Sequence, residues 1–367
     1  MQHRKIYKPS RVTSHLSHPA PLLEKLCIDG GCHYLPWNNP ALASTIFDGD
    51  LSSLRVLRLE YVRTELPWRN MVNLMSCTLH HTLTGDFTIG QLLDFFESAP
   101  RLRKIDLYNA KPTSSGENGR LVSLDRLKRV DIIECGPTSI FLNHLVTPVG
   151  AKLKTRLESY RFIIEDHIPR SLDNLKNLSK FTGIHLRLNN FLPHVRFVGP
   201  NGRFRMVAAM IDTNTTLVFE SLARFDTSKA EWLWINDLIP PFTDPRQTFL
   251  PIKNLRILVL CRCDCLSAFM GALNPNTSPS KEVVCPLLED LVFFLRTDRE
   301  FDVQGVIEVA AARASRGTKL RGVAIVGEHV ELDVADMLEL RKHILCVEYG
   351  HETHMECRES DDSDEED

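Results

Sequence analysis

The stretch Leu102-Arg103-Lys104-Ile105-Asp106-Leu107 contains the pattern that decides the fold of this 367-residue chain. Its apolar residues follow the order L-x-x-L-x-L, which is called the phrase below. The phrase returns at irregular intervals of roughly 20 to 33 residues. One such segment buries little by itself, whereas a stack of them can form a continuous core. The other copies begin at Leu23, Leu54, Leu74, Leu127, Leu255, Leu288 and Leu320.

Two features outside the phrase support true repetition. The tripeptides Leu35–Trp37 and Leu66–Trp68 each begin 12 residues after the first leucine of a copy. Two other copies extend to L-x-x-L-x-L-x-x-C and end at Cys135 and Cys263. In leucine-rich repeats, an Asn or Cys at this position turns inward and bonds to loop backbone.

Several segments between the copies have helical patterns. Thr88 to Ala99 opens with a capping-box spacing and ends before a proline, and Val303 to Arg316 stops at a glycine. Ile140 to Val146 and Val334 to Lys342 are shorter candidates. Repeated strand-then-helix order predicts an α/β leucine-rich-repeat solenoid, a horseshoe with a parallel β-sheet on the concave side. Helices and irregular connections would cover the convex side.

The chain divides by composition into three parts. Residues 1–20 form a basic N-terminal arm, 21–350 the irregular repeat domain, and 351–367 an acidic tail that we expect to be disordered. The repeat domain is least regular within about 157–251, where degenerate repeats with insertions are expected. Its strand candidates are Ile184–Leu188, Val195–Val198 and Phe204–Met210.

The composition, net charge and cysteine distribution argue against several classes of function. A hydrophobic fraction of 43% with 25% charged residues is typical of a soluble protein, and a net charge of −3 argues against nucleic acid as partner. No apolar run of about 18 residues predicts a membrane span, and the N-terminus lacks a secretory signal. The 10 cysteines are scattered singly, which predicts reduced thiols in a cytoplasmic and/or nuclear protein.

The candidate binding residues follow from strand geometry. If the named leucines point into the core, alternate positions point to the concave face. The early strands then present charged and polar side chains there, and the later strands present apolar ones. We expect a protein partner to contact this face through Arg58, Glu60, His80, Lys104, Asp106, Tyr108, Arg129, Asp131 and Phe294.

Two groups of cysteine and histidine resemble metal ligands but are not predicted to bind metal. In the group Cys261, Cys263 and Cys265, the first residue is expected to face opposite to the core residues of its repeat, the second fills a consensus core position, and no histidines lie nearby to complete a site. A second group, Cys346, His351, His354 and Cys357, has the right ligand types, but its spacing matches no common zinc finger. No phosphate-binding loop or nucleophile motif stands out, so we expect no catalytic residues, no cofactor and no enzyme activity.

The repeats, with Ser98–Leu102 and Phe141–Leu145, resemble the F-box/leucine-rich-repeat proteins expanded in mushroom-forming fungi. The resemblance implies substrate recognition for a cullin-type ubiquitin ligase, to which an N-terminal F-box docks through a Skp1-type adaptor. This chain departs from the pattern because its repeats begin near Pro21. Leu35-Pro36 with Ile46-Phe47 mimics an F-box opening but lies between two copies. We therefore expect adaptor binding only if an F-box is supplied.

The sequence leaves two main functions open. One is substrate recognition for a ubiquitin ligase, and the other is a free-standing scaffold or decoy that binds proteins without a ligase. A third, a GTPase-activating protein, is disfavoured because the repeats are irregular. The identity of the bound protein does not follow from the sequence.

Overall fold

The computed structural model describes much of the chain. The described residues are 16, 18–30, 41–42, 46–64, 68, 70–81, 87–110, 112–113, 119–136, 138–157, 172–178, 181–187, 194–199, 203–208, 222, 227–237, 245–277, 282–295, 301–327 and 332–350. They form a mixed α/β structure with a mostly parallel sheet of 14 strands and few helices. The chain groups into two compact units, unit 1 (1–181 and 195–211) and unit 2 (182–194 and 212–367).

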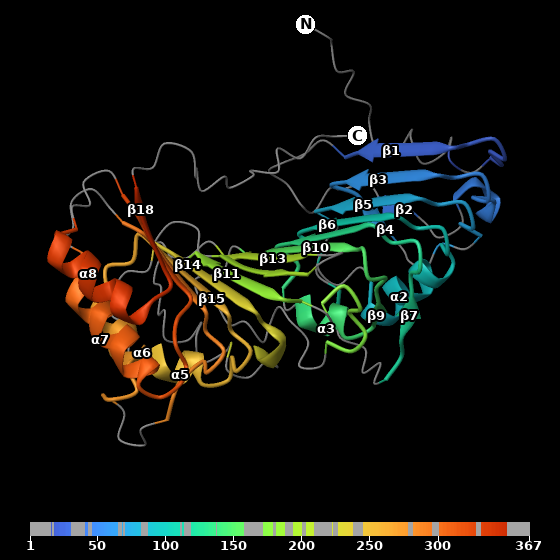
Figure 1. The fold of residues 1–367 in the computed structure, drawn as a ribbon. Coiled ribbons are helices and arrows are strands. Elements are labelled where there is room, and N and C mark those ends of the chain that lie inside the picture. The colour runs from blue at the N-terminus through green and yellow to red at the C-terminus, as the bar shows by residue number, and fades with distance from the viewer. Residues whose placement is uncertain are drawn as a thin grey trace, which may run out of the picture. The chain divides into compact units, whose positions relative to one another are not determined.

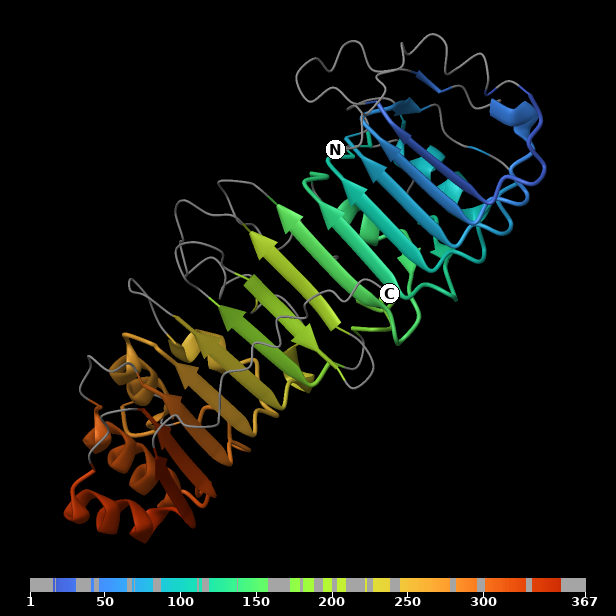
Figure 2. The same cartoon turned by 90° about the horizontal axis from the view of Figure 1, so that it is seen from above.

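Unit 1 is built on parallel strands that are paired mainly in chain order (Figures 1 and 2). In sheet order these are β1 (Lys25–Asp29), β3 (Val56–Glu60), β5 (Ser76–His80), β6 (Lys104–Tyr108), β8 (Arg129–Ile133), β10 (Lys152–Leu157), β13 (Arg203–Ala208) and β12 (His194–Val198). β12 runs opposite to its neighbour β13 (Figure 2).

Short elements of unit 1 connect these strands. The helical ones are η2 (Ile46–Gly49), α2 (Ile89–Glu97) and α3 (Thr138–Leu142). Two strand pairs, β2 (Ala41–Leu42) with β4 (Arg63–Thr64) and β7 (Val122–Ser123) with β9 (Leu145–Val146), form small parallel sheets.

Unit 2 repeats the strand-then-helix order more regularly. Its strands, in sheet order, are β11 (Gly183–Arg187), β14 (Trp232–Asn236), β15 (Ile257–Cys261), β16 (Asp290–Phe294), β17 (Gly322–Val326) and β18 (Cys346–Gly350). Its helical segments are η4 (Thr227–Lys229), α5 (Pro245–Phe249), α6 (Leu266–Leu273), α7 (Val303–Ala314) and α8 (Val334–His343). Figure 1 shows α5 to α8 together on one face of the strands, and no helix among the described residues of unit 2 lies on the other face.

The leucine-like positions of the repeated phrase form the core. Leu57 of β3 pairs with Cys77 of β5, and Cys77 pairs with Ile105 of β6, so equivalent positions lie side by side. All three side chains are almost fully buried. In unit 2, Leu258 of β15 and Leu291 of β16 continue the same rule. The expected direction of the phrase residues is therefore confirmed.

Two backbone hydrogen bonds recur around the strands. Before a strand, the first leucine of the phrase donates its N–H to the carbonyl three residues earlier, as from Leu102 to Ala99 at 3.0 Å. After a strand, one residue adopts a positive φ, as His81 does at 52°. Its N–H bonds to the end of the next strand, 2.7 Å from the carbonyl oxygen of Tyr108. These bonds set the register from strand to strand.

The helix predictions are confirmed where capping signals were strong. Thr88 caps α2 and Gln91 completes the capping box. α7 ends just before Gly317, whose φ is positive. α8 also lies where it was expected. The segment 140–146 is different, because α3 starts earlier, at Thr138, and is followed by β9. α5 and α6 were not predicted.

The irregular middle of the chain contains three of the expected strands. β11, β12 and β13 begin within one residue of the positions that alternation indicated. Their order was not foreseen, because β10 pairs with β13 and not with the next strand of the sequence.

Parts of several predictions lie outside the described residues. These are the tripeptide Leu35–Trp37, most of the arm 1–20, the tail 351–367 and the ligand candidates His351, His354 and Cys357. In the part of the chain that the structure describes, no helix is both long and apolar enough to cross a membrane.

Candidate interaction surface

In unit 1, α2 and α3 lie on one face of the sheet (Figure 1), and the opposite face, where no described helix lies, is called the helix-free face below. This face carries three rows of side chains, because strand pairing aligns alternate residues across it. One row runs along the strand starts: Lys25, Val56, Ser76, Lys104, Arg129 and Lys152. A middle row contains Cys27, Arg58, Thr78, Asp106, Asp131, Lys154 and Arg205. A third row contains Asp29, Glu60, His80, Tyr108, Ile133 and Arg156. The structure thus brings together every predicted site residue except Phe294.

An ion-pair chain crosses β3, β5 and β6. The guanidinium of Arg58 lies 2.6 Å from Oε1 of Glu60, and the same oxygen lies 3.2 Å from Nδ1 of His80. On its other side, Nε2 of His80 lies 3.3 Å from Oδ1 of Asp106. His80 therefore stands between two carboxylates. These contacts link side chains of three neighbouring strands across the face.

An aromatic cluster adjoins the ion-pair chain at the strand ends. Tyr61 stacks on His81 with ring centroids 4.3 Å apart. Tyr108 contacts both His81 and His80 edge-on, at 4.6 and 5.6 Å. The amide nitrogen of Asn109 lies 3.1 Å from Nδ1 of His81. These four rings are partly exposed, so a partner can reach them.

The sequence reasoning missed Tyr61 and His81. They directly follow β3 and β5, where the alternation rule for strands no longer applies. Their positive φ values, 54° and 52°, turn the rings back beside those of the face. Burial raises the pKa of Tyr61, and the nearby charge of Glu60 adds to the effect. The available sequence signal for these two residues was an aromatic ring directly after each of the two strands β3 and β5.

Asp131 is less accessible than the alternation rule implied. It was expected to face a partner, yet it is only 6% exposed. Its carboxylate accepts a hydrogen bond from Nε of Arg129 at 2.7 Å. Burial raises the pKa of Asp131, and the positive charge of Arg129 opposes that shift. Its role on this face is therefore to hold Arg129, and the expectation of an exposed carboxylate is wrong.

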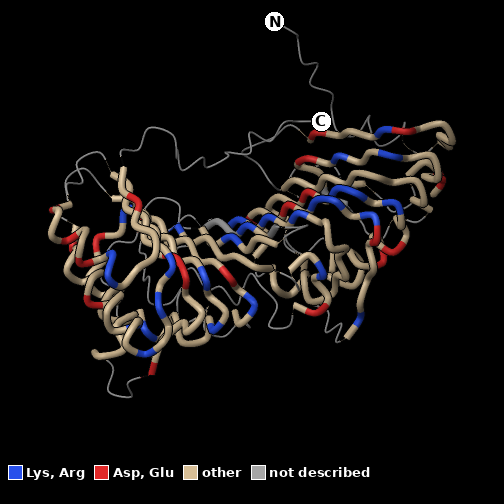
Figure 3. The backbone as a smooth tube through the Cα atoms, viewed as in Figure 1, with Lys and Arg blue, Asp and Glu red and all other residues tan. Residues whose placement is uncertain are grey.

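Lys and Arg residues are frequent along the central strands of the sheet (Figure 3). On β10, alternate residues point outward, whereas Leu153 and Thr155 between them are buried. On β13 and β12, buried Phe204, Val195 and Phe197 flank outward arginines in the same way. The resulting group, called the basic surface below, contains Lys104, Arg129, Lys152, Lys154, Arg156, Arg196 and Arg205.

The corresponding face of unit 2 differs because it carries an apolar cluster whose members Val259, Cys261 and Phe294 are buried. Phe294 was expected to be an exposed anchor, but it is only 6% exposed. Its ring stacks on that of Trp234 with an interplanar angle of 5°, and it packs with Val259 and Cys261. The expected exposure of Phe294 is therefore wrong, because a neighbour two strands away covers it.

Cysteines of the phrase behave as structural thiols. Cys135 and Cys263, at the end of the extended phrase, donate to carbonyl oxygens of the preceding repeat, Leu107 and Ile235. Among the described residues, no group of three or more His, Cys, Asp or Glu side chains is placed to hold a metal ion.

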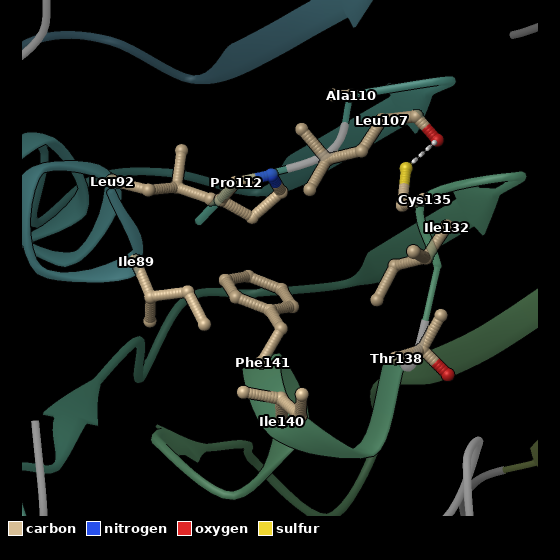
Figure 4. Close-up of a pocket in the computed structure, with 10 residues that line it drawn as sticks. All are labelled: Ile89, Leu92, Leu107, Ala110, Pro112, Ile132, Cys135, Thr138, Ile140 and Phe141. Carbon is tan, nitrogen blue, oxygen red and sulfur yellow. Dashed lines mark hydrogen bonds between the residues drawn. The ribbon is translucent and has the colours of Figure 1, made fainter. Parts of the chain in front are cut away.

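A small cavity lies on the helical side of unit 1 (Figure 4). Its volume is about 50 Å³, far below the roughly 300–1,000 Å³ of sites for drug-sized ligands. The lining is almost wholly apolar: Ile89, Leu92, Leu107, Ala110, Pro112, Ile132, Cys135, Thr138, Ile140 and Phe141. Its size and chemistry indicate a gap in packing between α2, α3 and the sheet.

Comparisons with known proteins add no identification. No protein-family model matches the chain, and neither a curated protein nor a solved structure does so.

Proposed function

We propose that this chain is a protein-interaction module built as a leucine-rich-repeat solenoid. The repeated phrase, the in-register pairing of its core positions and the recurring turns around the strands support the solenoid. Repeats of this kind offer an extended surface of parallel strands to a partner.

The observation that carries the proposal is the grouping of side chains on the helix-free face of unit 1. Tyr and Arg residues dominate the energy of many protein interfaces, and Tyr61, Tyr108 and Arg58 are partly or fully exposed there. The ion-pair chain through His80 holds this group in place before a partner arrives. A pre-organised surface loses less entropy on binding.

The test is binding by the full chain after a partner has been found by affinity purification and mass spectrometry. Tyr108→Ala should weaken binding by about 1–3 kcal/mol, measured by calorimetry, with little change in thermal stability. Glu97→Ala, at an exposed position of α2, is the control. It leaves Arg120 its contact with Asp94. If Tyr108→Ala leaves the affinity for the partner unchanged and Glu97→Ala lowers it, the partner binds on the helical side and the proposal is wrong.

The resemblance to F-box proteins extends this proposal to substrate recognition for a cullin-type ubiquitin ligase. The alternative is a scaffold or decoy without ligase association. The two are separated by whether the genomic sequence upstream of Met1 encodes an in-frame F-box, because this chain by itself is expected not to bind a Skp1-type adaptor. Stoichiometric adaptor bound to this chain would also assign docking to residues 35–47, against the expectation from sequence.

A further inference from the structure

We propose that the basic surface of unit 1 binds an acidic peptide segment of the partner protein. The inference rests on the proposed function and names the chemistry of its partner. Strand pairing places like charges side by side on this surface, and one of its guanidinium nitrogens is buried without a hydrogen-bond acceptor.

Strand pairing places cations directly opposite one another. Lys104 of β6 is the partner of Arg129 in β8, which is the partner of Lys152 in β10. Farther along, Lys154 of β10 is the partner of Arg205 in β13. Like charges that face each other on neighbouring strands, about 5 Å apart, destabilise a sheet. A bound anion would remove this repulsion.

The carboxylates of the protein itself offset only part of this charge. Asp131 bonds to Arg129, and its charge also acts on Lys154. Within the described ranges, no carboxylate lies within 4.0 Å of the charged groups of Lys104, Lys152 or Arg205. These cations are therefore available to acidic groups of a partner.

Arg205 supplies the second observation. Its Nε is buried, and no hydrogen-bond acceptor of the described structure satisfies it. A buried donor without an acceptor typically costs about 1–3 kcal/mol. Because Nε lies inside the protein, a carboxylate or phosphate on the partner would accept from the terminal nitrogens of this half-buried guanidinium, and arginine suits such contacts. Arg205 thus marks where an acidic side chain would sit.

The surroundings favour a peptide over a nucleic acid. Proteins that bind single strands usually stack bases on aromatic side chains between the basic residues. The outward positions of β8, β10 and β13 whose side chains are described carry no aromatic residue, and Tyr108 of neighbouring β6 lies at the opposite end of its strand from Lys104. Asp131 and the neighbouring Asp106 would also repel a continuous phosphate backbone. An acidic peptide can place its carboxylates at intervals and avoid both.

The experiment titrates a fluorescently labelled peptide with the full chain and measures fluorescence anisotropy. The peptide has about 12 residues, in which Glu and Ser alternate. A Gln–Ser peptide, a phosphoserine version and a twelve-nucleotide DNA strand serve as comparison probes. The test variant is Lys152→Glu with Lys154→Glu. The control is Lys253→Glu with Lys319→Glu, which changes the net charge equally at exposed lysines of unit 2.

The acidic peptide should bind more tightly than the Gln–Ser peptide, and the test variant should weaken it at least about tenfold while the control does not. Arg205→Gln should weaken it too. Binding should also decrease as salt rises. Equal loss in both double variants, or preference for the DNA strand, would overturn the inference. If acidic peptides do not bind but Tyr108→Ala still weakens binding of a purified partner, the inference is wrong and the proposed function stands.

Discussion

Leu107 gives a sharp test of the core, because both its burial and its surroundings are known. Its side chain is 2% exposed and lies between its pairing partners Leu79 and Ile132. It also lines the small cavity beside α2 (Figure 4). Leu107→Ala would therefore enlarge a space that the surrounding side chains already leave unfilled.

The expected cost has two parts. The mutation removes three buried carbon groups, and the hydrophobic free energy lost is about 0.8 kcal/mol for each, or about 2.4 kcal/mol together. If the void grows by roughly 50 Å³, a cavity cost of about 24 cal/mol per Å³ adds about 1.2 kcal/mol. The free energy of unfolding of unit 1 should thus fall by about 3.5 kcal/mol. For a unit of this size, that is a decrease in Tm of about 7–14 °C.

Thermal unfolding followed by circular dichroism measures this decrease. Leu121→Ala is the matched control, because Leu121 is 47% exposed and a few tenths of a kcal/mol is expected there. A shift below about 1 °C for Leu107→Ala, or equal shifts for both variants, would show that the register of the phrase is wrong.

Three further predictions concern capping, a buried cation and thiol reactivity. Thr88→Ala should destabilise unit 1 by about 1 kcal/mol in a urea titration, because α2 loses its capping box. Arg313→Met should cost about 2–3 kcal/mol in the same assay, since two buried carbonyls lose their donor; a stabilised variant would mean that desolvation of the charge dominates. Burial raises the pKa of Cys285 to about 12, so iodoacetamide at pH 8 should label exposed Cys27 and spare Cys285, as read by mass spectrometry. Equal labelling of both thiols in the native protein would contradict the packing around Cys285.

The sequence by itself determined the strands that carry the repeated phrase and which side of each is buried, whereas β10 and β14, which carry no complete copy of it, were not predicted. A strand has a period of two, so Leu57 and Leu59 must share a face, and the repeated phrase applies this rule in each copy. Local signals were equally reliable for α2, because Thr88 and Gln91 interact within a single turn. These features depend on neighbours in sequence, which a pattern can show.

Only the tertiary structure decided how the outward residues combine. The pairing of β10 with β13 sets Lys154 beside Arg205, and no local pattern links these two residues. Phe294 follows the alternation rule, yet Trp234 from two strands away covers it. Tyr61 and His81 enter the candidate surface through turns that follow their strands. Exposure and charge environment depend on contacts between distant segments, and those contacts form only when the chain folds.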